Sequence, residues 1–181
     1  NILIDEDYRP RLCDFGLSRC LPGKFDKYVK STVGGKIGTP YYMAPEIIRG
    51  GHEYNSKNDV YSFGLLAYEV VTGEKPFGEI SYYELTEKIK NKERPKFPKT
   101  INKNIANLIS KCWDDDPDKR PSFDEIYEIL TKNLSYSNEY FDENEIKEYI
   151  EILDEERKDP KDEKNLSKNT IIYAEPKPVK Q

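Results

Sequence analysis

The stretch that decides the fold begins with Asp-Phe-Gly at Asp14–Gly16 and ends with Ala-Pro-Glu at Ala44–Glu46. Two short apolar runs, Asn1–Asp5 and Pro10–Asp14, lie on either side of a polar tetrapeptide, which predicts a β-hairpin. An Asp-x-Gly tripeptide is common turn chemistry, so taken alone it indicates only a hairpin exit with a solvated carboxylate. The region after it is rich in Gly, Ser, Thr and Lys, and loops of this length are usually functional or disordered.

Helical signals dominate further along the chain. Ser56–Asp59 reads as a capping box, which predicts a helix over Asp59–Thr72 that ends at the following glycine. Capping boxes at Ser81–Glu84 and Ser122–Glu125, with an apolar repeat near 102–113, predict three more helices. Apolar residues cover nearly every side of the first helix, which is typical of a buried helix. These residues are Val60, Phe63, Leu65, Leu66, Ala67, Val70 and Val71.

The composition changes after about Leu134. We expect a globular lobe over 1–134, an amphipathic helix within 135–157 and a mostly disordered charged tail over 158–181. The simpler interpretation of the helix is a solvated linker, and the alternative is that its apolar face docks on the lobe or on a partner. That predicted face, within Glu143–Arg157, carries Ile146, Tyr149, Ile150 and Leu153.

Charge and cysteine content exclude several classes of function. The 29 Lys and Arg residues against 34 Asp and Glu residues give a net charge of −5, which does not favour nucleic-acid binding. No stretch approaches the roughly 18 apolar residues of a membrane helix, so no membrane span is predicted. Three cysteines without CxxC spacing indicate a reducing compartment, and we expect a cytoplasmic protein. With His52 as the only histidine, a Cys/His zinc site and a Ser-His-Asp triad are disfavoured.

Five motifs occur in a fixed order: Asn1 before Ile-Leu-Ile, the Asp-Phe-Gly and Ala-Pro-Glu triplets, Asp59–Gly64, and Cys112–Trp113 before Arg120–Pro121. Together they resemble the C-lobe of a eukaryotic protein kinase domain, from Asn1 to about Leu134. The resemblance implies an α+β fold that is mainly helical, with a short β-hairpin at its N-terminal end and no N-lobe. The Gly-Thr pair at 38–39 and the Cys-Trp pair are most similar to serine/threonine kinases of the tyrosine-kinase-like group.

The resemblance implies an ATP and magnesium site. Asn1 matches the last residue of the catalytic loop and Asp14 matches the Asp-Phe-Gly aspartate, so both would bind Mg²⁺ that bridges the ATP phosphates. Cys13 would line the floor of the nucleotide site, as a small apolar residue rather than a reactive thiol. Phe15 would pack against the N-lobe, and Gly16 would give the activation loop its backbone freedom.

Residues from about Leu17 to Met43 resemble an activation segment. The stretch that starts at Gly38 is similar to the one that receives the substrate peptide. Thr39 is similar to the serine/threonine-kinase form, in which the hydroxyl orients the catalytic loop. Ser31 and Thr32 are candidate phosphorylation sites, with ordinary loop hydroxyls as the equal alternative.

A further group of residues matches structural positions of the family. Glu46, which follows Ala44 and Pro45, would form a buried ion pair with Arg120 beneath the activation segment. Asp59 would hold the catalytic-loop backbone from the buried helix.

The family's catalytic aspartate lies five positions before the asparagine that matches Asn1. The 181 residues contain no counterpart of it, of the ATP-binding lysine or of the glycine-rich loop. We therefore expect a parent serine/threonine kinase that uses ATP and Mg²⁺ on protein substrates, and a chain that is inactive by itself. The alternative is a non-catalytic pseudokinase or a truncated kinase-like binding module, although the presence of both Asn1 and Asp14 weighs against a pseudokinase.

Overall fold

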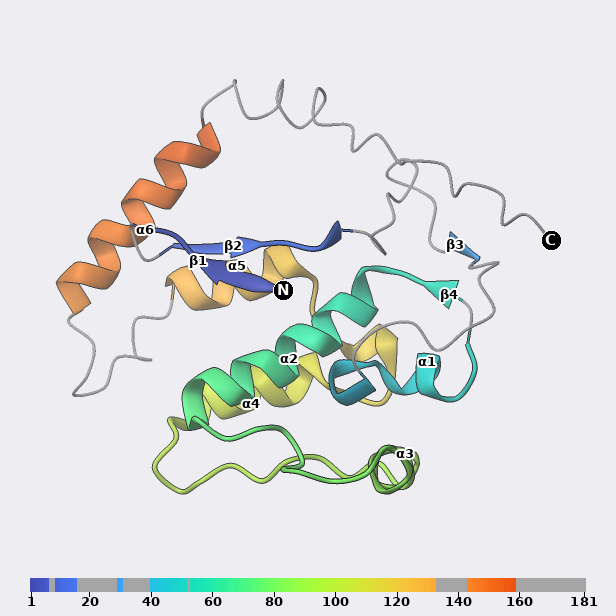
Figure 1. The fold of residues 1–181 in the computed structure, drawn as a ribbon. Coiled ribbons are helices and arrows are strands. Elements are labelled where there is room, and N and C mark those ends of the chain that lie inside the picture. Colours follow the sequence, from blue (N-terminus) through green and yellow to red (C-terminus); the bar gives the residue numbers. More distant parts are fainter. Residues whose placement is uncertain (7–8, 16–28, 31–39, 52, 133–142, 159–181) are drawn as a thin grey trace. The chain divides into compact units, whose positions relative to one another are not determined.

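The structure is a computed structural model that describes residues 1–6, 9–15, 29–30, 40–51, 53–132 and 143–158. Contacts divide the chain into two units, Asn1–Ile129 and Leu130–Gln181. The described elements (Figure 1) are β1 (Ile2–Ile4), β2 (Pro10–Leu12), β3 (Val29–Lys30), η2 (Pro40–Tyr42), α1 (Pro45–Ile48), β4 (Glu53–Tyr54), α2 (Ser56–Thr72), α3 (Tyr82–Lys90), α4 (Lys103–Cys112), η3 (Pro117–Lys119), α5 (Phe123–Lys132) and α6 (Glu143–Lys158).

The predicted β-hairpin is confirmed. Strands β1 and β2 pair antiparallel with Ile2 opposite Leu12, and β3 pairs antiparallel with β4. Asp5 stabilises the turn of the hairpin. Its carboxylate accepts a hydrogen bond from the Arg9 amide at 2.8 Å and forms an ion pair with Arg11 at 2.8 Å. The fold class predicted from the sequence, mainly helical with an N-terminal hairpin, is also confirmed.

Helix α2 begins at Ser56, three residues before the predicted start at Asp59, and its N-cap lies one residue before the predicted Ser56. Its N-cap is Asn55, whose side chain accepts from the Lys57 amide, while the Asn58 side chain accepts from the Asn55 amide at 2.7 Å. The capping box assigned to Ser56 was therefore wrong, because the asparagine before it satisfies the same free amides. The C-terminal end at Gly73 is as predicted, with the glycine in the left-handed conformation at φ 71°.

Helices α2 and α4 lie side by side and form the core (Figure 1). One face of α2 is fully buried against α4 and its flanking loops, and Arg120 is buried beside it. The prediction that α2 is buried all round was wrong at Val70, whose side chain is 75% exposed because it points away from Tyr61 and Leu65. The fully or nearly buried apolar residues of the two core clusters are Ala44, Tyr61, Leu65, Tyr68, Ile109 and Trp113, and Val60, Leu108, Cys112 and Ile126.

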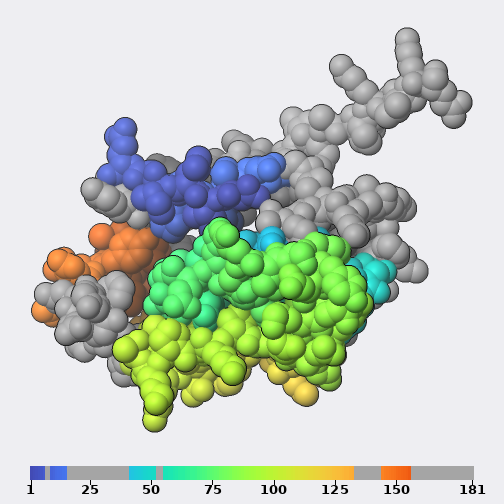
Figure 2. Space-filling model, turned by 60° about the horizontal axis from the view of Figure 1, so that its bottom comes forward, coloured from blue at the N-terminus to red at the C-terminus, as the bar shows by residue number. Residues whose placement is uncertain are grey.

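The loop between α3 and α4 is anchored by aromatic rings. Phe97 stacks on Trp113 with ring centroids 5.3 Å apart, and Tyr68 lies 5.4 Å from Phe97. Offset and tilted ring pairs of this kind add specificity to burial. Figure 2 shows α2, α3, α4 and their loops, coloured green to yellow, as one continuous packed surface.

The capping boxes predicted for α3 and α5 are both confirmed. The Ser81 hydroxyl accepts from the Glu84 amide at 3.2 Å, and the Glu84 carboxylate accepts from the Ser81 amide at 2.9 Å. Ser122 and Glu125 make the same reciprocal pair. Backbone and side-chain hydrogen bonds from Ser81 lower the pKa of Glu84, and those from Ser122 lower the pKa of Glu125. Both carboxylates therefore stay charged at the start of a helix, where the helix dipole favours an anion.

The second unit contains α6, which matches the predicted Glu143–Arg157 helix to within one residue. Ile146, Ile150 and Leu153 are half-buried, whereas the predicted face residue Tyr149 is 41% exposed. The predicted tail covers 158–181, and its first residue, Lys158, is the last residue of α6. The predicted lobe boundary at Leu134 and the tail residues 159–181 lie outside the described residues. Within the described ranges, no helix has the length and apolar character needed to cross a membrane.

Candidate functional site

The hairpin brings together the first residues singled out by the sequence. The Cys13 amide donates to the Asn1 carbonyl at 2.9 Å, which continues the β1–β2 register. Asn1, which precedes β1, and Asp14, which follows β2, therefore lie at the same end of the hairpin. Asp14 has a φ of 60°, in the left-handed region that asparagine and aspartate tolerate best among non-glycine residues.

The donor chemistry of this end fits a magnesium ion. Asn1 supplies an amide oxygen and Asp14 a carboxylate, both side chains are exposed, and Mg²⁺ binds through one or two carboxylates while it keeps waters and phosphate oxygens. Cys13 is half-buried beside them, and the Phe15 side chain is 46% exposed. Across the part of the chain that the structure describes, no group of three or more His, Cys, Asp or Glu residues could hold a metal ion.

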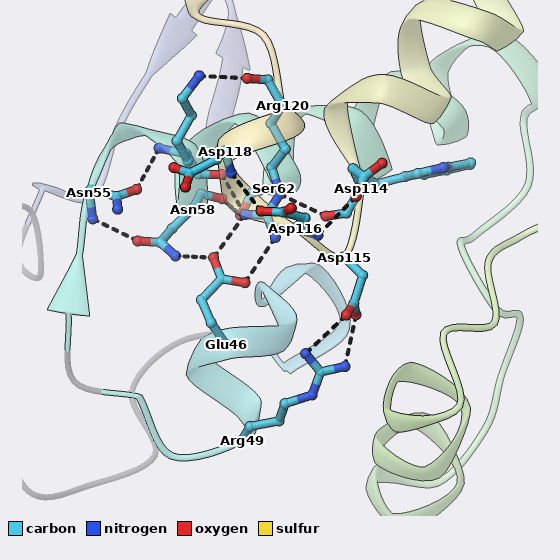
Figure 3. A network of polar contacts seen from close by, with 12 residues as sticks. Glu46, Arg49, Asn55, Asn58, Ser62, Asp114, Asp115, Asp116, Asp118 and Arg120 are labelled. Carbon is cyan, nitrogen blue, oxygen red and sulfur yellow. Dashed lines mark hydrogen bonds and ion pairs between the residues drawn. The ribbon is translucent and has the colours of Figure 1, made fainter.

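Helix α1 starts at Pro45, within the Ala-Pro-Glu triplet. Ala44 is 2% exposed in the core, and its carbonyl accepts from the amides of Ile47 and Ile48. Pro45 occupies the first helical position, where its missing N–H costs nothing and its fixed φ suits the helix. Glu46 then projects from the first turn toward the C-terminal part of the lobe (Figure 3).

Glu46 meets Arg120 in a bidentate ion pair. The two guanidinium nitrogens of Arg120 donate to Oε1 and Oε2 of Glu46, each at 2.8 Å. The Arg120 side chain is 0% exposed and that of Glu46 is 25% exposed. Two further N–H groups of Arg120 donate to the carbonyls of Asp114 at 2.8 Å and Lys57 at 2.9 Å, so each nitrogen of the buried guanidinium is hydrogen-bonded.

The aromatic ring of Tyr61 lies between two arginines. The guanidinium carbon of Arg120 is 5.0 Å from the ring centroid, and that of Arg94 is 5.4 Å away. Both distances suit cation–π attraction. Burial raises the pKa of the Tyr61 hydroxyl despite the two positive charges, so the ring presents a neutral face to them.

Sequence reasoning missed a second ion pair on α1. The guanidinium of Arg49, the C-cap residue of α1, donates to the Asp115 carboxylate at 2.8 and 3.3 Å. Lys92 and Arg94 reach the same carboxylate at 3.8 and 3.7 Å. Partial burial opposes ionisation of Asp115, but the Arg49 hydrogen bond and the three positive charges outweigh it and lower the pKa. No sequence signal pairs residues 49 and 115, because isolated exposed charges carry no information about distant partners.

The segment before α1 is tethered by two adjacent tyrosines. The Tyr42 hydroxyl donates to the Glu69 carboxylate of α2 at 2.5 Å, and the Tyr41 hydroxyl donates to the Ile80 carbonyl. The Ser62 hydroxyl also donates to the Tyr42 carbonyl at 2.8 Å. Desolvation, together with the Glu69 hydrogen bond and its negative charge, raises the pKa of Tyr42 to about 12.

A hollow lies between this segment and the loop that follows α2. It has a volume of about 580 Å³ and opens to solvent, with an exposed Lys75–Glu79 ion pair at its edge. Its lining is mainly apolar. The lining residues are Tyr41, Tyr42, Lys75, Pro76, Gly78, Glu79 and Ile80.

Comparison with known proteins identifies this arrangement. A family model described as protein tyrosine and serine/threonine kinase matches residues 1–130. The chain belongs to this kinase family. The match covers the hairpin end, both α1 ion pairs and the hollow, which therefore all lie within the kinase domain.

Among the relatives are kinases of a social amoeba and of a plant. A probable serine/threonine-protein kinase of Dictyostelium discoideum is 41% identical over 138 residues, which is 76% of this chain and 14% of the relative. The dual specificity protein kinase shkE of the same organism is 42% identical over 137 residues, 75% of this chain and 19% of the relative. The serine/threonine-protein kinase CTR1 of Arabidopsis thaliana is 37% identical over 131 residues, 72% of this chain and 15% of the relative. The chain thus spans less than a fifth of the length of these three relatives.

The remaining predicted kinase residues fall into two groups. Asp59 lies exposed in the first turn of α2, and among the described residues no side chain pairs with its carboxylate. Partial burial of the Asp59 carboxylate still removes water from it, and this loss of hydration raises the pKa of Asp59. The others lie outside the described residues: Gly16, Ser31, Thr32, Gly38 and Thr39.

Proposed function

We propose that this chain is the nucleotide-facing and substrate-receiving part of a serine/threonine protein kinase, which transfers the γ-phosphate of ATP to hydroxyl groups of protein substrates. The observation that supports this most is the position of Asn1 and Asp14 at one end of the hairpin. Phosphoryl transfer needs little covalent chemistry from the protein, and depends on oxygen ligands that place a metal–nucleotide complex.

In this proposal Asn1 and Asp14 hold the magnesium ion. The bound ion would neutralise charge on the ATP phosphates. The amide oxygen of Asn1 and the carboxylate of Asp14 share its coordination, and Cys13 supplies a small half-buried wall beside them. The left-handed backbone at Asp14 turns the chain sharply at this point, which suits a residue whose side chain must face a ligand.

The substrate would lie against the tethered segment. Tyr41 and Tyr42 fix the backbone at 40–42, and the apolar hollow beside them offers room for a side chain of an extended peptide. The serine/threonine preference rests on Thr39 and on relatives that bear that name. Several relatives, shkE among them, are named dual specificity kinases, so the acceptor residue needs a direct measurement.

The test is phosphate transfer by the full-length gene product. With labelled ATP, Mg²⁺ and a general acceptor protein, we expect label on serine and threonine, identified after acid hydrolysis. Asp14→Asn should lower the rate by at least about 100-fold, the usual loss when an electrostatic ligand of the transition state is removed. Asp118→Asn is the matched control, because it removes an exposed carboxylate in η3 far along the chain from the hairpin, and it should leave the rate unchanged.

The opposite result would favour the non-catalytic alternative. The hairpin has several exposed apolar side chains, including Leu3 at 63% and Leu12 at 69%, which would suit a module that binds another polypeptide. If no label is transferred and Asp14→Asn behaves like the unmodified protein, the chain is a kinase-derived binding module. Restricted to residues 1–181, the polypeptide should transfer no phosphate in either case, since it contains no counterpart of the catalytic aspartate.

A further inference from the structure

Helix α1 needs attachments from outside itself. It has four residues, its N-cap Ala44 provides no side-chain hydrogen bond, and Gly50 follows it with a φ of 90°. One helical turn has no stability of its own in water, because nucleation fixes several dihedral angles for a single hydrogen bond. The orientation of α1, and of the chain that leads into it, therefore depends on tertiary contacts.

Two ion pairs attach α1 to the same turn of the chain, residues 114–120. Glu46 of α1 binds Arg120, and Arg49 at its end binds Asp115 (Figure 3). Glu46 and Arg49 are three residues apart, so they project from neighbouring positions on one side of α1. Each element thus contributes one carboxylate and one guanidinium.

The order of the charges allows only one pairing. If α1 slid or rotated so that the partners exchanged, Glu46 would face Asp115 and Arg49 would face Arg120, and both contacts would be repulsive. The Glu46–Arg120 pair and the buried Ala44 and Pro45 all hold the start of α1, so without the Arg49–Asp115 pair its end has no ion pair to hold it. The second pair fixes that end of α1.

The two ion pairs differ in burial and in the other contacts of their side chains. Arg120 is enclosed and also bonds the carbonyls of Asp114 and Lys57, so the first pair is part of the core. The side chains of Arg49 and Asp115 are 36% and 23% exposed. Without Arg49, Asp115 still has Lys92 and Arg94 beside it, whereas α1 has lost its second attachment. Loss of Arg49 should then loosen α1 and leave the rest of the lobe folded.

We infer that Arg49 is a positioning residue of the proposed kinase reaction, acting through Asp115 to fix α1 and the segment before it. The inference rests on the proposed function for its catalytic meaning, because that segment is the one proposed to receive the substrate. Its structural content is independent, since it concerns only which contact keeps α1 in place.

Hydrogen–deuterium exchange of the full-length gene product tests the inference. The amides of Ile47, Arg49, Gly50 and Gly51 each bond a carbonyl of α1 or its cap, so their exchange reports local opening of the helix. We expect Arg49→Met and Asp115→Asn each to speed this exchange about threefold, as a partly exposed bidentate pair implies. The double variant should be no faster than either single variant, and Arg49→Lys should recover part of the protection.

The control and the kinetic measurement separate this role from a general structural one. Lys90→Met breaks an exposed ion pair with Glu87 on α3 and should leave exchange in α1 unchanged. In an active protein, Arg49→Met should raise KM for the protein substrate about threefold and leave KM for ATP unchanged.

Three outcomes would overturn the inference: unchanged exchange in α1 for both single variants, an equal rise across the whole lobe, or additive effects in the double variant. Absence of phosphate transfer by the unmodified protein would instead overturn the proposed function. Faster exchange confined to α1 would then still establish Arg49 as the residue that fixes this helix.

Discussion

Gly64 of α2 lies directly against Cys112 of α4, where the two core helices pack together. A Cβ atom built on Gly64 would lie 2.8 Å from the Cβ atom of Cys112 and 3.3 Å from the backbone nitrogen of Trp113. Gly64 is helical, so its glycine is required by the close approach of the partner helix and not by a special backbone conformation. At the position of Gly64, the space between α2 and α4 has no room for a methyl group.

Gly64→Ala should therefore destabilise the lobe. Alanine is the better helix former by about 1 kcal/mol, but overpacking against backbone and Cβ atoms typically costs about 1–3 kcal/mol. We expect a net loss of up to about 2 kcal/mol in the free energy of unfolding, measured from the urea midpoint. Val70→Ala on the same helix is the control, since that side chain is 75% exposed and should change stability by less than about 0.5 kcal/mol. A midpoint that rises in Gly64→Ala would show that the helices can move apart freely.

Glu46→Ala should cost about 3–5 kcal/mol of stability, because it leaves the guanidinium of Arg120 buried without a countercharge. Glu46→Gln retains the shape and one acceptor oxygen, so its loss should be smaller. Arg120→Lys retains the charge but cannot supply the forked donors that reach Glu46, Asp114 and Lys57 together, and should also destabilise. Denaturation midpoints of the three variants measure these losses of stability. An unchanged midpoint in Glu46→Ala would contradict the structural role of the pair.

Tyr42 should make stability depend on pH in the alkaline range. Its pKa is raised from 10.0 to about 12, so the folded state retains the phenolic proton over an interval in which the unfolded chain has lost it. The stabilisation is fully present below about pH 10 and is lost as pH rises from there through about 12. Ultraviolet titration of tyrosinate in the wild type and in Tyr42→Phe should show one late-titrating group that the variant lacks. If the group that the variant lacks instead titrates near the ordinary tyrosine value of about 10, the hydroxyl is not bound to Glu69.

The parts of the fold that the sequence predicts well are those decided by a few adjacent residues. The capping boxes at Ser81 and Ser122 are satisfied within one turn, so their pattern is sufficient. At the start of α2, two consecutive residues with capping side chains compete, and the pattern alone does not choose Asn55 over Ser56. The one-turn helix α1 was missed because it has no periodic pattern, and its formation depends on residues far along the chain.

The candidate site was predictable only where a family resemblance named the residues. Glu46 and Arg120 lie 74 positions apart, and only the resemblance paired them. Arg49 and Asp115 match no family motif, so nothing in the sequence linked them. Burial of α2 on all sides was overpredicted because apolar content tells which residues can be buried, but not how many neighbours the fold supplies. The roles assigned to Asn1, Asp14 and the activation segment remain predictions.

The unequal exposure of the two ion pairs on α1 has a consequence for ionic strength. Dissolved ions cannot approach the enclosed guanidinium of Arg120, but they reach Arg49 and Asp115, which are 36% and 23% exposed. Screening lengths shorten from about 10 Å at 0.1 M to about 3 Å at 1 M, so added salt weakens the outer pair and leaves the inner one nearly unaffected. Salt would then weaken one of the two ion pairs of α1 without unfolding the lobe. The placement of the segment before α1, which is proposed to receive the substrate, would respond to the electrolyte, while the stability of the lobe would not.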